Sequence, residues 1–301
     1  MDGNFVCAIL NLVATEPQQE LLVWPGATAA EPPTTYTGLN LAQRIAAGRQ
    51  ALASQRVLPG QRGVAAGAGG SRADLCAVGH YGARRHGGAS AGGRYAPGVL
   101  RRGQMSALIN LQPALRLLRW VARACNVSCF TTSNLPSTGN LLKPARAVPL
   151  TQAALISHSS GSTGTPKEVT RSHRILLAQH EVLKQVFPPW AGQRDFHLFP
   201  NALLHNLSVA IVSVLPQVPW SNIPQLNPEV VVRQIAHEEV QTLTGNVFYL
   251  QRLLPALRAW PGGFPTVAGV GVGGSPVPKG LLQGLQLVLK YPSATVPTRA
   301  R

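Results

Sequence analysis

The chain has 301 residues, of which 45% are hydrophobic, and it carries 27 Lys and Arg against 11 Asp and Glu. This length and apolar content are enough to bury the core of one large domain or of two smaller ones. The formal net charge of +16 raises nucleic acid as a partner. However, the excess is spread along the chain, and its one dense block, residues 62–102, has few of the aromatic residues that stack on bases. We therefore expect no specific nucleic-acid binding.

Cysteine content and apolar segments bear on the compartment. Four scattered cysteines are too few for a disulfide framework, and the first residues lack the order of a signal peptide. The longest apolar stretch, from Asn201, is interrupted by polar residues and by Pro216, so we expect no membrane span. Cys125 and Cys129 have the spacing of some zinc ligands, but no second Cys or His pair follows, so no metal site is expected. These features predict a cytoplasmic protein.

The first predicted elements lie before residue 61. The segment ELLVW suits a short buried strand, and apolar residues at helical spacing predict a helix that begins near Asn40. Residues 62–103 are rich in Gly, Ala and Arg without a period of two or 3.6, so we expect this block to be poorly ordered. The block also resembles out-of-frame translation of GC-rich DNA. Regular patterns return at Met105, with a helix opened by Pro113.

Strands and helices alternate from Thr151 on. AALIS predicts a strand, Asn227 is placed to cap a helix that closes at His237, and VQTLT predicts the next strand. VFYLQRLLPALRAW predicts a helix interrupted near Pro255, and TVAGVGV predicts a further strand that ends in GGSP. Helices between such strands predict an α/β fold with layered, mostly parallel sheets flanked by helices, in which ligands bind at the carboxyl ends of strands.

One more helix is expected after Ser172, whose hydroxyl is placed to cap it, and it should run to about Phe187. His173 and His180 are interpreted as surface residues of this helix, because neither has a carboxylate partner at helical spacing. The predicted apolar stripe of the helix includes Ile175, Ala178, Val182 and Val186.

The run SSGSTGTPK, from Ser159 to Lys167, raises the question of phosphate binding. It has too few apolar residues to bury itself, so we expect a solvent-facing loop that joins a strand to a second short strand or to a helix. Glycine lets the backbone approach a ligand, hydroxyls donate hydrogen bonds and lysine supplies a positive charge, which are the groups that surround a polyphosphate. Taken alone, such a run is also typical of a flexible linker. Pro166 stands between Gly164 and Lys167, which excludes a Walker A motif.

The longer stretch LISHSSGSTGTPKEVTRSH resembles the signature phosphate loop of the adenylate-forming superfamily, which includes acyl-CoA synthetases and fatty-acyl-AMP ligases. The resemblance implies that the loop folds over the β- and γ-phosphates of ATP, accompanied by Mg²⁺, while a carboxylate attacks the α-phosphate. Glu168 departs from the family pattern, which usually has Gly after the Lys. The implied ATP-phosphate residues are Ser159, Ser160, Gly161, Ser162, Thr163, Gly164, Thr165, Pro166 and Lys167.

Two later segments follow in the family order. FPNALLHNL is similar to the motif that brings an aromatic residue or His, here His205, against the acyl substrate. Taken alone, His205 is more often a satisfied helix histidine, and GVGGSP is a turn. GVGGSPVP is similar to the strand-end turn that lies against adenine, and the implied residues are Gly273, Gly274, Ser275 and Pro276.

The resemblance also implies the organisation of the chain, which we interpret as an incomplete N-terminal domain of an adenylate-forming ligase. The family's later motifs and its C-terminal lid domain with the catalytic lysine are absent from the sequence, so no complete catalytic set is assigned. The implied parts are a first α/β subdomain at 1–150, with 62–103 poorly ordered, a second subdomain with the phosphate loop at 151–290, and a tail at 291–301.

The sequence therefore favours ATP-dependent activation of a carboxylic (fatty) acid to an acyl-adenylate, in a truncated and impaired form that we expect not to turn over. Coenzyme A is one candidate acceptor. Within the family, the chain most resembles long-chain or olefin-pathway acyl ligases. The alternatives are a non-catalytic remnant that binds a nucleotide or a partner, and a basic nucleic-acid-associated protein.

Overall fold

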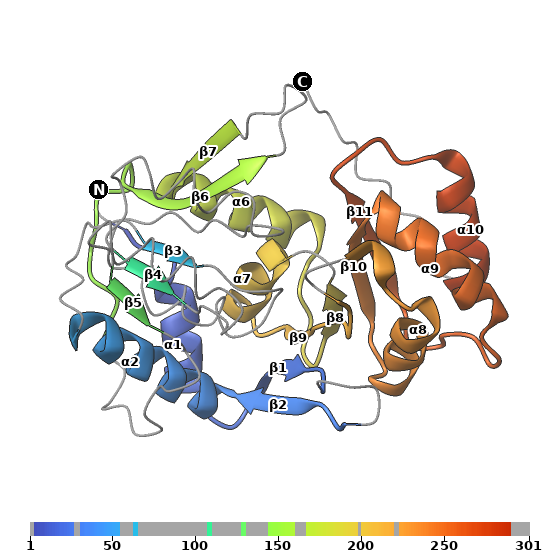
Figure 1. Ribbon diagram of the computed structural model, residues 1–301, viewed down its shortest axis with the longest axis horizontal. Coiled ribbons are helices and arrows are strands. Elements are labelled where there is room, and N and C mark those ends of the chain that lie inside the picture. Colours follow the sequence, from blue (N-terminus) through green and yellow to red (C-terminus); the bar gives the residue numbers. More distant parts are fainter. Residues whose placement is uncertain are drawn as a thin grey trace. The chain divides into compact units, whose positions relative to one another are not determined.

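The chain falls into two compact units in the computed structural model, whose helices and strands are labelled in Figure 1. The first unit comprises Met1–Pro17 and Gly38–Val182, and the second comprises Gln18–Thr37 and Leu183–Arg301. The residues that the structure describes are 3–26, 31–54, 63–65, 107–109, 128–130, 144–159, 167–197, 200–219 and 223–289. Apart from 63–65, the Gly/Ala/Arg block at 62–103 lies outside them, as do the helix predicted at Pro113, Cys125 and the tail at 291–301.

The described part of the second unit is built on a six-stranded sheet with the strand order β11-β10-β8-β9-β1-β2. Its neighbouring strands pair in parallel, apart from the antiparallel β1–β2 pair. Helices connect the parallel strands, because a parallel pair needs a long crossover. This arrangement confirms the predicted mostly parallel α/β class. The strands are β1 (Glu20–Trp24), β2 (Thr34–Thr37), β8 (Arg194–His197), β9 (Val212–Val214), β10 (Thr242–Asn246) and β11 (Gly269–Gly273).

One face of this sheet is apolar. Phe196 is in register with Val214 on β9 and with Leu243 on β10, and all three side chains are buried in one core cluster. Alternation along each strand sends these side chains to the same side. Three amphipathic helices, with their apolar faces in the same cluster, cover this side: α8 (Pro228–His237), α9 (Val247–Ala259) and α10 (Lys279–Leu289).

The opposite face of the sheet carries polar residues. Asp195 is in register with Ser213 on β9 and with Thr242 on β10. On β11, the residues of this face are the glycines at 269, 271 and 273, which alternate with the valines of the apolar face. Helix α7 (Pro200–Ser208) contacts β8 and β9 and lies over the polar side, where Asn206 bonds Asp195.

Two helices of the second unit test the predictions on helix ends. Asn227 caps α8 as predicted, because its side chain accepts hydrogen bonds from the backbone N–H groups of Glu229 and Val230. The predicted interruption of α9 at Pro255 is wrong, since the helix continues through this residue to Ala259. Proline removes one backbone donor, but the buried apolar side chains on both sides of it keep the helix against the sheet.

The described part of the first unit contains three helices and two small sheets. Strands β6 (Ala153–Ser159) and β7 (Lys167–Ser172) form an antiparallel hairpin, and a parallel sheet has the strand order β3-β4-β5. The other elements are α1 (Cys7–Thr15), α2 (Gly38–Ser54), α6 (His173–Val186), β3 (Gly63–Ala65), β4 (Ala107–Ile109) and β5 (Ser128–Phe130). Among the described helices, none combines the length and the apolar character that a membrane span requires.

Helix α6 begins after Ser172 as predicted, and the Ser172 Oγ accepts a hydrogen bond from the N–H of Ile175 at 3.3 Å. The predicted orientation of the helix is wrong. His173 and His180 are buried, with exposed fractions of 1% and 7%, whereas 49% of Ile175 is exposed. Val182 and Val186, also assigned to the apolar stripe, are exposed as well.

The reason for this orientation lies far away in the sequence. The backbone N–H of Phe5 donates to Nδ1 of His173 at 3.1 Å, and the ring of Phe5 meets the ring of His180 edge-on, with centroids 6.1 Å apart. Burial lowers the pKa of His173, because the charged imidazolium loses its hydration. The N-terminal segment therefore packs on the histidine face of α6 instead of the aliphatic stripe.

Candidate functional site

The run from Ser159 to Lys167 connects the two strands of the β6–β7 hairpin. Ser159 is the last residue of β6 and is in register with Lys167, the first residue of β7. The strand predicted from AALIS is confirmed as β6. The predicted alternative of a second short strand after the run is confirmed, since β7 (Lys167–Ser172) precedes α6. The seven residues between this pair, Ser160 to Pro166, lie outside the described residues.

A second candidate segment begins where β11 ends, in the second unit. Gly273 closes β11, and Gly274 has a φ of +87°, which L side chains rarely adopt. Gly274, Ser275 and Pro276 are exposed. This turn follows the carboxyl end of a strand in a mostly parallel sheet, which is the edge at which ligands collect in such folds.

The space beside this turn is open. A Cβ atom added at Gly273 would meet no heavy atom of the described residues within 4 Å. At Gly271, an added Cβ would lie 3.5 Å from Thr244 Oγ1 and 3.7 Å from Phe187 Cζ. The glycines of β11 thus leave a strip without side chains, with an aromatic ring close to it. Such a strip lets a flat ligand approach the backbone.

Residues of β10 border the glycine strip. Asn246 is in register with Gly273, and Thr244 is in register with Gly271. The side chain of Asn246 also caps α9, since it accepts a hydrogen bond from the N–H of Tyr249 at 2.9 Å. Sequence reasoning did not single out Asn246 or Thr244, because only the register between β10 and β11 brings them beside the turn.

His205 lies on α7, the helix over the polar face of the second-unit sheet. It is buried, with an exposed fraction of 9%, and the next residue, Asn206, donates to the carboxylate of Asp195 at 2.9 Å. His197, at the end of β8, is fully buried on the same face. The chain therefore provides imidazole, hydroxyl and carboxylate groups on one side of this sheet.

Each of these segments has its own chemistry. Among the described residues, no three His, Cys, Asp or Glu side chains are grouped so that they could hold a metal ion. An open glycine strip fits a planar base, and a run of hydroxyls with a lysine fits phosphates.

Comparison with known proteins gives a consistent result. The family model described as "AMP-binding enzyme" matches residues 100–292. The olefin beta-lactone synthetase of Stenotrophomonas maltophilia (strain K279a) is 31% identical over 137 residues, which is 45% of this chain and 24% of that protein. The olefin beta-lactone synthetase of Xanthomonas campestris pv. campestris is 25% identical over 217 residues, which is 64% of this chain and 38% of that protein. The chain thus spans well under half the length of these relatives.

Solved structures share the fold. Acetoacetyl-CoA synthetase from Streptomyces lividans has a TM-score of 0.79 and 16% identity, over 96% of this chain and 50% of that protein. The fatty acyl-adenylate ligase from L. pneumophila, solved with acyl adenylate and pyrophosphate, has a TM-score of 0.76 and 15% identity, over 95% of this chain and 52% of that protein. These likenesses confirm the expected fold class.

Proposed function

Because the chain belongs to the family of AMP-binding enzymes, we propose that it binds ATP and acts in the activation of a carboxylic acid to an acyl-adenylate. In this reaction a carboxylate oxygen attacks the α-phosphorus, the bond to the β-phosphate breaks, and pyrophosphate leaves. The finer proposal is a fatty acid as substrate. It is supported by the sequence resemblance to long-chain acyl ligases and by the name of one structural neighbour, a fatty acyl-adenylate ligase.

The observation that carries the proposal is the β6–β7 hairpin. Ser159 and Lys167 are paired, so the Ser/Gly run starts and ends at the same end of a two-stranded ribbon. A loop held in this way offers backbone N–H groups, hydroxyls and one cation to a single anion. We assign the β- and γ-phosphates of ATP to this loop, with Lys167 as the counter-charge.

The other assignments follow the same logic. The open turn after β11, from Gly273 to Pro276, is assigned to adenine, and His205 on α7 is assigned to the wall of the acid pocket. Mg²⁺ is assigned as the companion of ATP, whose phosphates it shields. Coenzyme A is one candidate acceptor of the acyl group.

The experiment compares Lys167→Ala with the parent chain in ATP binding, measured by calorimetry. A charge-assisted phosphate contact is worth about 1.5–3 kcal/mol, so the variant should bind ATP roughly 10- to 150-fold more weakly. Lys184→Ala, in the last turn of α6, is the matched control, since it removes an equal charge outside the loop.

Three results distinguish the proposed function from its alternatives. A parent chain that does not bind ATP contradicts the proposed function, and equal affinity in Lys167→Ala contradicts the phosphate assignment. Pyrophosphate release with ATP, Mg²⁺ and a fatty acid identifies an acyl-activating enzyme. ATP binding without release identifies a nucleotide-binding chain, the alternative that the sequence also left open.

A further inference from the structure

A buried carboxylate lies between β8 and its two neighbours, β10 and α7. Asp195 has an exposed fraction of 3%, and the described hydrogen-bond donors to its carboxylate are neutral. Its Oδ1 accepts from the hydroxyls of Thr242 and Thr244 at 2.8 and 3.0 Å. Its Oδ2 accepts from Nδ2 of Asn206 at 2.9 Å. A buried charge is costly unless it is paired or hydrogen-bonded, and here these bonds offset that cost.

The two carboxylate oxygens serve different elements. The bonds from Thr242 and Thr244 join β8 to β10, which the backbone ladder of the sheet already pairs. The bond from Asn206 joins β8 to α7, which no ladder attaches. A neutral Asn at position 195 could keep this bond, because its Oδ1 can accept from Asn206 while its Nδ2 donates to the hydroxyls of Thr242 and Thr244, which also accept. Loss of the bond therefore requires a change at Asn206.

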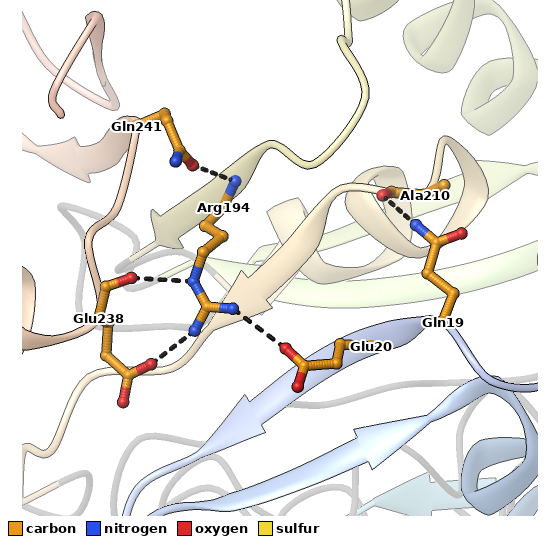
Figure 2. A network of polar contacts seen from close by, with 6 residues as sticks. All are labelled: Gln19, Glu20, Arg194, Ala210, Glu238 and Gln241. Atoms are coloured by element: carbon orange, nitrogen blue, oxygen red, sulfur yellow. Dashed lines mark hydrogen bonds and ion pairs between the residues drawn. The ribbon is translucent and has the colours of Figure 1, made fainter.

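Asn206 also lies in the last turn of α7, two residues before its end at Ser208. Its backbone carbonyl accepts hydrogen bonds from the N–H groups of Val209 and Ile211, both at 3.1 Å. The chain then turns at Ala210, whose carbonyl accepts from Gln19 Nε2 at 3.1 Å (Figure 2). The side chain and the backbone of Asn206 thus fix the same end of the helix.

Apolar contacts alone would hold α7 less specifically. Leu203 and Leu207 are almost fully buried, but hydrophobic burial is non-directional and does not set the rotation of a nine-residue helix. The hydrogen bond to Asp195 does set it. Because His205 precedes Asn206 by one residue, any rotation of α7 moves the imidazole.

We infer that Asp195 is a positioning residue, which holds α7 through Asn206 and so fixes His205 over the polar face of the sheet. This inference rests on the proposed function, in which His205 forms the wall of the pocket for a carboxylic acid. Asp195 itself does not touch the substrate, so its effect reaches acid binding and leaves ATP binding unchanged.

The test uses Asn206→Leu, and it uses Asn206→Asp alone and together with Asp195→Asn. In each single variant at position 206 the side chain no longer donates to the carboxylate of Asp195. The double variant restores the pair, with Nδ2 of residue 195 donating to a carboxylate at 206. Thr244→Val is the matched control, because it removes a hydroxyl from Oδ1 and leaves the bond to α7 intact.

Hydrogen exchange and ligand affinity are measured on the full chain. In Asn206→Leu, the α7 amides should exchange at least about tenfold faster while α8 and α9 stay within about twofold, since a lost bond to a charged group changes an opening constant by this much. The affinity for dodecanoate should fall by a similar factor, and the affinity for ATP should not change. The double variant should recover both quantities, and Thr244→Val should not change α7 selectively.

The outcomes are distinct. Equal acceleration of exchange in α7, α8 and α9 overturns the inference, because a general loss of stability would then explain the variant. Faster exchange confined to α7 with unchanged dodecanoate affinity overturns the link to His205. A parent chain that binds neither ATP nor dodecanoate refutes the proposed function, and exchange in α7 then decides whether Asp195 holds the helix. If Asn206→Leu does not fold, Asn206→Asp replaces it with the same expectations.

Discussion

Arg194 contacts Glu238 in two ways (Figure 2). The Nη2 atom of Arg194 lies 2.6 Å from Oε2 of Glu238, and its Nε donates to the backbone carbonyl of the same residue at 2.9 Å. A third nitrogen, Nη1, lies 3.2 Å from Oε2 of Glu20. One guanidinium therefore joins the start of β8 to the end of α8 and to β1.

These contacts predict unequal effects of substitution on the free energy of unfolding. The side chain of Glu238 is 10% exposed and that of Glu20 is 53% exposed, so the pair with Glu238 is the stronger one. Arg194→Met should lower the free energy of unfolding by about 1–3 kcal/mol, and Glu20→Gln by at most about 1 kcal/mol. Arg194→Lys should recover little, because an ammonium lacks the planar fork.

Urea unfolding of the three variants measures these differences. Equal losses in Arg194→Met and Glu20→Gln would contradict the ranking, since the exposed pair would then contribute as much as the buried one. Raising the salt concentration should weaken the effect of Glu20→Gln more than that of Arg194→Met, because screening acts mainly on exposed charges.

Substitution of Pro255 is predicted to raise the free energy of unfolding, in contrast to the substitutions at Arg194 and Glu20. Proline has no backbone N–H, so α9 lacks the hydrogen bond that residue 255 would donate to the carbonyl of Gln251. Pro255 is exposed, and its replacement leaves no buried cavity. Pro255→Ala should therefore raise the free energy of unfolding by about 1–2 kcal/mol, which is the helix gain less the added entropy of the unfolded chain. Thermal unfolding followed by circular dichroism checks it, and a loss of stability would mean that the ring makes contacts that outweigh the missing bond.

The predictions that succeeded rest on chemistry local in the sequence. Ser172 and Asn227 cap their helices through N–H groups two or three residues away, so each pattern contains both partners. The segment AALIS likewise predicts a strand from its own residues. In contrast, the partner of His173 is Phe5, 168 residues away, and nothing near α6 indicates which face it buries.

The residues of the candidate site also differ in whether their partners are close in the sequence. The Ser/Gly run was found from sequence because its nine residues are consecutive. Asp195 was not found, because its donors on α7 and β10 lie 11 and 47 residues away and meet it only through the register of the sheet. Such clusters have no spacing that a linear pattern could recognise.

The buried His173 predicts how stability depends on pH. Its pKa in the folded chain lies below the ordinary 6.5, because burial disfavours the imidazolium, and its Nδ1 must be unprotonated to accept the N–H of Phe5. As the pH falls below 6.5, the unfolded chain takes up a proton that the folded chain resists. The stabilisation is thus full above pH 6.5, declines as the pH falls through the folded pKa, and is constant below it.

The comparison is between the parent chain and His173→Gln, whose amide can still accept the N–H of Phe5. Unfolding by urea at pH 7.5 and at pH 5.5 gives the slope, to which one histidine contributes at most about 1.4 kcal/mol per pH unit. The variant should have a smaller slope than the parent. Identical slopes would assign the pH dependence to other groups.

The turn after β11 allows stability and ligand binding to be separated. Gly274 has a φ of +87°, so Gly274→Ala should lower the free energy of unfolding by about 1–2 kcal/mol. Gly273 lies outside the left-handed region and has open space around its Cβ position. Gly273→Val should therefore leave stability unchanged or raise it slightly, since valine favours a strand.

Substitution of Gly273 also predicts an effect on nucleotide binding. If adenine lies against the turn, the valine at position 273 occupies space that the base needs, and forcing the two together costs about 1–3 kcal/mol, roughly a 5- to 150-fold loss of ATP affinity. Gly269→Val, at the other end of β11, is the control, because among the described residues its Cβ would meet only a methyl group of Thr242, at 3.8 Å. Calorimetric titration with ATP compares the parent chain with Gly273→Val and Gly269→Val. Parental affinity in Gly273→Val, with stability retained, would mean that adenine binds elsewhere, whereas weakened binding in Gly273→Val alone would assign the open end of the glycine strip to the base.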